Sequence, residues 1–130
     1  MKGTFHLAFA SGDLEKAKEF YGNFLNCKVG RSGPSWVDYD FFGHQLTIQY
    51  LSAKNQTYSN FHHPSSGFPL NHWGIILNWG DWHTLKDKLV AEGVEFAVPP
   101  QVAMEGEVGE QNILMLRDPD GNVLEFKSFE

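Results

Sequence analysis

The sequence predicts an α+β fold in which two βαβββ modules of one chain form a cup-shaped, mostly antiparallel sheet with helices on the outside. Three observations support this fold. The order strand, helix and three strands occurs twice, each first strand carries a histidine, and each half closes with a strand that follows a glycine, Gly43 or Gly121. One such module cannot bury its sheet face alone. We therefore expect the two sheets to associate around a shared concave surface.

The chain has 130 residues, which suits one domain with a substantial core. We place module one at about residues 3–53, a loop at about 54–70 and module two at about 71–130. The loop is rich in Asn, Ser, Pro and Gly, which interrupt regular structure. Long loops inside compact domains are often binding segments.

In the first half, apolar residues run as a strand until Ser11 and Gly12 break it. Asp13 is the expected N-cap of a helix that ends near Asn26, because apolar residues recur at helical spacing between them. The strands predicted in this half cover residues 4–10, 28–31, 35–42 and 45–51.

The last of these strands alternates polar and apolar residues. A period of two places Gln45, Thr47 and Gln49 on one face of the sheet and the apolar side chains on the other. A polar face on an inner strand would indicate a site, whereas the same face on an outer strand would only contact water.

In the second half, a helix follows Gly80-Asp81 and ends at Gly93. The strand predicted at residues 94–98 is expected to end at Pro99-Pro100. Asp-Pro-Asp-Gly at 118–121 predicts the turn of a hairpin. The strands predicted here cover residues 71–77, 94–98, 112–116 and 122–126.

Composition excludes several classes of function. The net charge is −6 without a basic stripe, so nucleic acid is not an expected partner. No apolar run reaches about 18 residues, and the first residues lack the apolar region of a signal peptide. The single cysteine, Cys27, excludes an internal disulfide and favours a reducing compartment, so we expect a cytoplasmic protein. Cys27 follows a predicted helix end and is expected to be a buried thiol rather than a nucleophile.

The duplication suggests a metal site. It places His6 and His72 at equivalent points of two first strands, with Glu125 on the last strand of module two. Alignment of the two glycines puts Thr47 opposite Glu125, with Gln49 next on the same face. Two imidazoles and a carboxylate suit a divalent first-row metal with open positions, and the lack of sulfur argues against structural zinc. Taken singly, each of these residues is more often a hydrogen-bonded structural group.

Several segments resemble the vicinal oxygen chelate superfamily, which includes glyoxalase I, fosfomycin-resistance transferases, methylmalonyl-CoA epimerase, extradiol dioxygenases and bleomycin-binding proteins. The resemblance covers essentially the whole chain. It is carried by Phe5–Ala8, Asp13–Tyr21, Asn71–Gly74 and Asp118–Phe126. Two further segments, Phe41–Gln45 and Gly106–Gln111, resemble a subgroup described as glyoxalase or dioxygenase-like.

The resemblance implies one divalent metal ion held by His6, His72 and Glu125. It implies a fourth ligand from module one, for which Gln49 matches best and Thr47 is the alternative. Related sequences carry His at the position of Gln49. The identity of the metal is therefore left open between Fe, Mn, Ni, Zn and Mg, with Fe(II) favoured. The resemblance also implies a homodimer.

The function expected from these features is a metal-dependent enzyme acting on a small molecule with vicinal oxygens. Dioxygenase chemistry is favoured over a glyoxalase-like lyase or isomerase, because Gln49 offers no carboxylate base and two His with one carboxylate suit Fe(II) and O₂. The rival is a metal-free drug-binding protein of the bleomycin-resistance type, whose members tend to lack the ligand set.

Five other residues are candidates for the site. His44 is a candidate acid or base beside Gly43, and Glu110 is a second catalytic candidate. Glu110 and Gln111 open the strand that pairs with the Glu125 strand, near the expected rim of the cup. Gln111, Thr47 and Trp73 are candidate substrate contacts, although Trp73 equally suits a place in the core.

Overall fold

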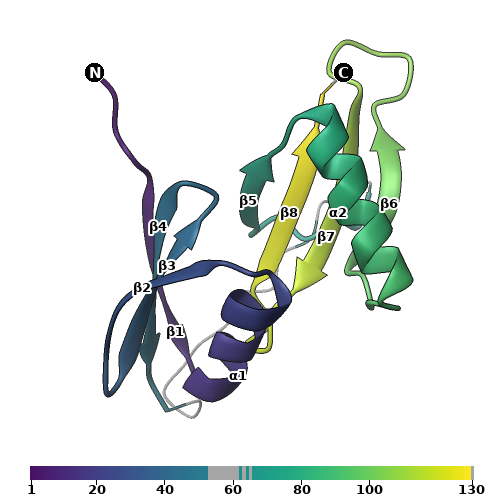
Figure 1. Cartoon of the computed structure of the whole chain (residues 1–130). Coiled ribbons are helices and arrows are strands. Elements are labelled where there is room, and N and C mark those ends of the chain that lie inside the picture. The colour runs from purple at the N-terminus through teal and green to yellow at the C-terminus, as the bar shows by residue number, and fades with distance from the viewer. Residues whose placement is uncertain (53–61, 63, 65, 130) are drawn as a thin grey trace. The chain divides into compact units, whose positions relative to one another are not determined.

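The computed structural model describes residues 1–52, 62, 64 and 66–129, which form two compact units (Figure 1). One unit holds the described residues up to Ser52 together with Asp118–Asp120, and the other holds the described residues of 62–117 and 121–129. Much of the predicted loop, residues 54–61, 63 and 65, lies outside the described residues. Within the described residues each unit carries one four-stranded mixed sheet, so the predicted α+β class is confirmed.

The first unit has the predicted order of strand, helix and three strands. Its elements are β1 (His6–Ser11), α1 (Leu14–Lys18), the π-helical segment η1 (Glu19–Phe24), β2 (Lys28–Gly33), β3 (Trp36–Phe41) and β4 (His44–Tyr50). The strands lie in the order β1-β4-β3-β2, with β1 parallel to β4 and the other neighbours antiparallel. The polar–apolar strand β4 is therefore an inner strand.

The helix of this unit begins at the predicted cap. Asp13 has an extended backbone, and its carboxylate accepts a hydrogen bond from the Lys16 N–H at 3.1 Å. Beyond α1 the helix widens, because the Leu25 N–H donates to the carbonyl of Phe20, five residues back, at 2.8 Å. Asn26 then adopts a φ of 58°, which ends the helix where the sequence predicted.

The apolar face of the first sheet packs against this helix. Leu46 and Ile48 of β4 are 1% and 0% exposed, and Tyr21 of η1 is also fully buried. The ring of Tyr21 lies 5.8 Å from that of Phe9 in β1 and 6.5 Å from that of Tyr39 in β3. The opposite face of the sheet carries the polar side chains of Gln45, Thr47 and Gln49.

The turn at Asp118–Asp120 is part of this first unit. The buried hydroxyl of Tyr21 donates to Asp118 Oδ2 at 2.7 Å, and the Gly12 N–H donates to Asp120 Oδ1 at 2.8 Å. Burial and, next, the Asp118 carboxylate raise the pKa of Tyr21 well above its usual value, so the phenol stays a donor. The predicted turn thus also binds the helix of the first unit.

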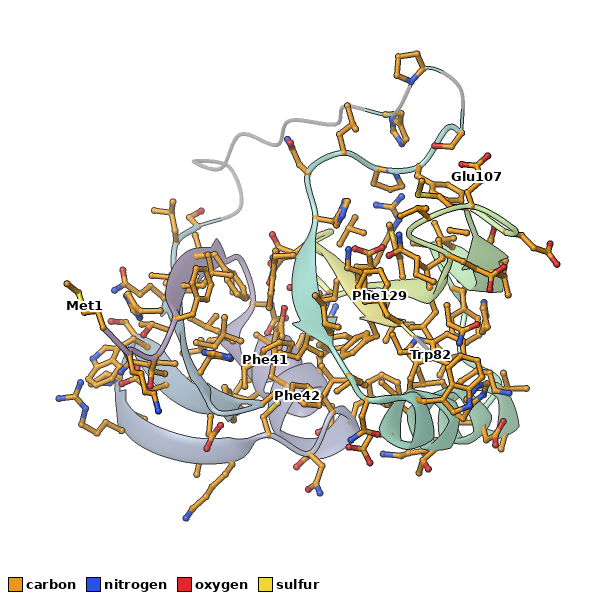
Figure 2. All side chains as sticks on the ribbon, turned by 90° about the horizontal axis from the view of Figure 1, so that it is seen from above. Met1, Phe41, Phe42, Trp82, Glu107 and Phe129 are labelled. Atoms are coloured by element: carbon orange, nitrogen blue, oxygen red, sulfur yellow. The ribbon has the colours of Figure 1, made fainter. Side chains whose placement is uncertain are left out.

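The second unit repeats the topology. Its elements are β5 (Trp73–Ile76), α2 (Trp79–Ala91), β6 (Val98–Ala103), β7 (Gln111–Arg117) and β8 (Val123–Ser128). The strands lie in the order β5-β8-β7-β6, with β5 parallel to β8. Trp82 on α2, labelled in Figure 2, is buried and donates its indole N–H to the carbonyl of Phe126 at 2.9 Å. No helix among the described residues is long and apolar enough to cross a membrane.

Two element boundaries in this unit differ from the prediction. Helix α2 begins at Trp79, before Gly80-Asp81, because Asn78 acts as the N-cap and accepts from the Asp81 N–H at 2.8 Å. The strand predicted at 94–98 is wrong. Strand β6 starts at Val98 and continues through both prolines, since it is an edge strand whose pairing with β7 shifts register between Val98 and Gln101.

Strand β8 lies unusually close to β5 at one point. Gly74 pairs with Glu125, and a Cβ atom on Gly74 would overlap the carbonyl oxygen of Glu125. The obstructing atoms belong to the backbone of Glu125, so no side-chain rotation could relieve the overlap. The close approach of these two strands therefore requires glycine at position 74.

We predict that Gly74→Ala lowers the free energy of unfolding by about 3 kcal/mol, because β5 must separate from β8 to admit a methyl group. Urea unfolding followed by tryptophan fluorescence measures this change. Gly80→Ala is the matched control, since a Cβ there meets only Asn78 Oδ1 at 3.7 Å, an ordinary contact, and alanine favours the helix. Equal stability of the two variants would contradict the close approach.

Cys27 follows the end of η1 and is partly buried, whereas the sequence predicted a buried thiol. Burial, followed by the nearby Asp40 carboxylate, raises the pKa of the Cys27 thiol from 9.0 to about 11. The thiol is therefore neutral at neutral pH, which does not favour a nucleophile.

This pKa shift predicts a stability that falls between about pH 9 and pH 11. Over that range the unfolded thiol loses its proton before the folded one does, so rising pH favours unfolding, whereas below pH 9 the contribution is constant. Cys27→Ala is expected to show a shallower fall between pH 9 and pH 10, measured from urea midpoints. A fall of the same slope in both proteins would refute the assignment.

Candidate metal and substrate site

The structure brings His72 and Glu125 together in the second unit. His72 directly precedes β5. Gly74, two residues after His72, pairs with Glu125 of β8. His72 Nε2 is 3.2 Å from Glu125 Oε2, and the two side chains are 30% and 13% exposed. The sequence singled out both residues, and the parallel register of β5 and β8 accounts for their approach.

The ring of His72 is held from its other side. His72 Nδ1 lies 2.8 Å from the carbonyl oxygen of Pro69, which can only accept a hydrogen bond. With its proton on Nδ1, the neutral ring turns the lone pair of Nε2 towards Glu125. This carbonyl, imidazole and carboxylate arrangement is common around metal-binding histidines. A doubly protonated ring would instead form an ion pair with Glu125.

Lys127 also lies beside Glu125. It is two residues further along β8, hence on the same face, and its Nζ is 3.9 Å from Glu125 Oε2. The ammonium also lies 5.8 Å from the centre of the Phe129 ring. Lys127 was not predicted as a site residue, although its spacing of two from Glu125 places it on the same face of the strand.

A cavity of about 470 Å³ opens on this face of the second unit, and His72, Glu125 and Lys127 lie along it. Most of the other lining side chains are apolar. They include Phe68, Leu70, Met104, Ile113 and Met115. A cavity of this size, with few polar groups in an apolar wall, is typical of sites for small organic molecules.

Two predicted residues at the start of β7 have different surroundings. Gln111 lines the cavity, and its buried Oε1 has no hydrogen-bond partner among the described residues. Its Nε2 donates to the Gly109 carbonyl at 3.3 Å. Glu110 is exposed and does not line the cavity, and its Oε1 accepts from the Gly106 N–H at 2.8 Å. Glu110 thus helps to hold the loop before β7.

Trp73 does not line the large cavity. It borders a smaller cavity of about 240 Å³ beside β5, together with His72, Glu125 and Lys127. The half-buried indole is therefore near the histidine and carboxylate, but outside the apolar cavity.

In the first unit, the register of β1 and β4 identifies the counterpart of Glu125. Ala8, two residues after His6, pairs with Thr47, just as Gly74, two residues after His72, pairs with Glu125. Thr47 therefore occupies the position of Glu125, as the glycine alignment suggested.

Gln49 lies further along the same face. His6 pairs with Gln45, and Gln49 is four residues beyond, roughly 13 Å along the strand. Thr47 is only two residues beyond Gln45, so in register it lies nearer to His6 than Gln49 does. The choice between Thr47 and Gln49 as fourth ligand stays a prediction.

Asp38 is a buried carboxylate on the face of the first sheet that carries His6. It pairs with Thr47 across β3 and β4, and its Oδ1 accepts from the Thr47 hydroxyl at 2.7 Å. Its Oδ2 lies 3.5 Å from Arg31 Nη2, and the residue is only 5% exposed. Asp38 was not predicted as a site residue, although its alternation with the apolar Val37 and Tyr39 places it on the polar face of the strand.

His44 lies on the other face of this sheet. It pairs with Phe41, and its neighbour Gln45 is the residue that pairs with His6. The Nδ1 atom of His44 accepts the backbone N–H of Phe5 at 3.0 Å, and the two rings make an edge contact. The structure thus gives His44 a part in holding the start of β1.

Among the described residues, no group of three or more His, Cys, Asp and Glu side chains lies close enough together to hold a metal ion. His72 and Glu125 supply an imidazole nitrogen and a carboxylate oxygen within the second unit, and His6 is an exposed residue of the first. The donor types suit a divalent first-row ion. The pair fits such an ion as two of its ligands.

Comparison with known proteins shows the family. The model of the glyoxalase/bleomycin resistance protein/dioxygenase superfamily matches residues 3–126. A protein of that description from Alicyclobacillus acidocaldarius is 30% identical, with a TM-score of 0.80 over 98% of this chain and 91% of its own. A search of curated proteins finds no match.

Two more distant structures share the fold. The fosfomycin resistance protein FosX from Listeria monocytogenes is 20% identical, with a TM-score of 0.68 over 100% of this chain and 95% of its own. A glyoxalase/dioxygenase from Nostoc punctiforme is 12% identical, with a TM-score of 0.71 over 99% of this chain and 92% of its own. With the duplicated βαβββ topology and the match over residues 3–126, the chain belongs to the glyoxalase/bleomycin resistance protein/dioxygenase superfamily.

Proposed function

We propose that this protein is a metal-dependent enzyme that acts on a small molecule with two neighbouring oxygens. The observation that carries the proposal is the arrangement of His72, whose Nδ1 is fixed on the Pro69 carbonyl and whose Nε2 faces Glu125 beside an apolar cavity. An ion pair with a purely structural role does not require a neighbouring cavity. A pair of metal ligands in an enzyme does require one, because the substrate must reach the metal.

In this proposal His6 is the third ligand, and β4 supplies the fourth from Thr47 or Gln49. A divalent ion bound there would polarise the substrate oxygens and stabilise negative charge that develops on them. The side chains of the cavity would position the substrate and keep water from its apolar part. Membership of a superfamily that includes fosfomycin-resistance and dioxygenase proteins supports the proposal.

Proton transfer of the glyoxalase type is our first candidate for the reaction. The absence of a carboxylate at Gln49 had favoured dioxygenase chemistry, but Asp38 places a buried carboxylate on the face that carries His6. The Thr47 hydroxyl donates to Asp38 Oδ1 and so holds the carboxylate in place. Asp38 would accept a proton from a carbon atom next to a substrate carbonyl.

Dioxygenase chemistry is the second candidate. Two histidines and one carboxylate form the ligand set of many non-haem Fe(II) enzymes that use O₂, and His6, His72 and Glu125 would supply such a set. The metal-free drug-binding protein is the alternative outside enzymes, and metal analysis separates it from both candidates.

We predict that the protein, purified without a chelator or a metal-binding tag, takes up about one equivalent of Fe(II), Mn(II), Ni(II), Zn(II) or Mg(II). His72→Ala and Glu125→Gln are expected to weaken uptake at least about 10-fold, because the first removes an imidazole ligand and the second replaces a carboxylate with an uncharged amide. Elemental analysis and calorimetric titration measure the binding, and circular dichroism checks that the fold persists.

His83→Gln is the matched control, since the ring of His83 on α2 packs against those of Trp79 and Trp82 and lines neither cavity beside Glu125. It should bind metal like the wild-type protein. Failure of the wild-type protein to bind any of these metals would refute the metal-dependent enzyme and leave the drug-binding alternative.

We also predict that Asp38→Asn slows metal-dependent exchange of the carbon-bound protons of hydroxyacetone, a small molecule with adjacent oxygens, by about 100-fold or more. Nuclear magnetic resonance in D₂O, with Zn(II) or Mg(II) added, measures the rate. Asp40→Asn, on the same face of β3, is the control, because an asparagine there can still accept the Gly43 N–H.

An unchanged exchange rate in Asp38→Asn would remove Asp38 as the base. Consumption of O₂ with catechol by the Fe(II)-loaded wild-type protein, without proton exchange, would select the dioxygenase candidate instead.

A further inference from the structure

Among the described residues that line the large cavity of the second unit, Lys127 carries an ammonium group. Its neighbour along the face, Glu125, is 3.9 Å away from it, at the limit of an ion pair, and the Lys127 side chain is 29% exposed. The ammonium has three donors, and a contact this long engages them weakly. Among the described lining residues, Lys127 is thus the cation available to an anion that enters the cavity.

An unused acceptor lies near this ammonium. Ile113 of β7 pairs with Lys127 of β8, and Gln111 is two residues before Ile113 on the same face, so Gln111 and Lys127 are diagonal neighbours. Gln111 Oε1 is buried without a hydrogen-bond partner among the described residues, while its amide nitrogen is engaged by the Gly109 carbonyl. Buried acceptors are rarely left without a donor, so this oxygen suits a hydroxyl group of a ligand.

Much of the rest of the cavity wall is apolar. Ile113 and Met115 are 3% and 1% exposed and form a packed cluster with Val98 and Val123, against which Phe68 also packs. This apolar part of the wall can take up an aliphatic or aromatic group. Besides the expected metal ligands His72 and Glu125 and the exposed Ser66 and Gln101, the polar residues that line the cavity are Gln111 and Lys127.

We propose that this cavity selects small hydroxycarboxylates with an apolar body. In the bound state Lys127 pairs with the carboxylate, Gln111 Oε1 accepts from the hydroxyl group, and the body lies against Ile113 and Met115. The inference rests on the proposed function, because it names the substrate class for the same site. It assigns the selection to side chains other than the expected metal ligands.

Binding of three matched probes tests the proposal. They are 2-hydroxy-3-phenylpropanoate, its methyl ester, which lacks the charge, and 3-phenylpropanoate, which lacks the hydroxyl group. Calorimetric titration of the full chain, with and without added Zn(II), measures each dissociation constant. The wild-type protein is expected to bind the hydroxy acid about tenfold or more tightly than the ester, since hydrogen bonds to charged groups are among the stronger ones.

Lys127→Met should abolish the preference for the acid over the ester and leave ester binding unchanged, because methionine keeps the length of the apolar stem. Lys127→Arg should retain the preference. Lys28→Met, an exposed position on β2, is the control for loss of one positive charge from the chain.

Gln111→Leu should abolish the preference for the hydroxy acid over 3-phenylpropanoate. Asn23→Leu is its control for loss of one side-chain amide, because Asn23 is exposed on η1 and does not line the cavity.

The inference is overturned if the wild-type protein fails to bind the hydroxy acid at millimolar concentration, or binds it no better than the ester. It is also overturned if Lys127→Met keeps the preference. These outcomes are distinct from failure of the proposed function, which metal uptake reports. A protein that takes up metal but ignores the charge of the probe keeps the proposed function and loses this inference.

Discussion

The inner position of β8, between β5 and β7, is the constraint on which the candidate site depends. Because side chains alternate along a strand, β8 buries Leu124 and Phe126 on one face and presents Glu125 and Lys127 on the other. The buried face is fixed by Trp82, whose indole donates to the Phe126 carbonyl. A shift of register by one residue would exchange the two faces and bury both charges.

The two units share one topology and one register but differ in chemistry. In the second unit, Gly74, two residues after His72, pairs across the strands with the carboxylate residue Glu125. In the first unit the equivalent position is Thr47, and the carboxylate comes from the adjacent strand, at Asp38, joined to Thr47 by a 2.7 Å hydrogen bond. The duplicated scaffold therefore carries its carboxylate on a different strand in each unit.

Element order was predictable from hydrophobic period and turn residues, because these are local properties. The cap at Asp13 and the helix end at Asn26 were found for the same reason. Strand β6 was misplaced because proline usually interrupts a strand, and only its position at the edge of the sheet makes Pro99-Pro100 acceptable there. That position depends on β7 and β8, which follow later in the chain.

The α+β fold, the family and the choice of His72 and Glu125 were predictable without coordinates, since a period of two and a repeated motif are visible in the amino-acid order. Tertiary structure alone decided the partners of each side chain. Lys127, Gln111 and Asp38 gained their significance from neighbours across strands, namely Glu125, the cavity wall and Thr47. Such neighbours are set by the register between strands, and register follows from the packing of whole sheet faces rather than from any one segment.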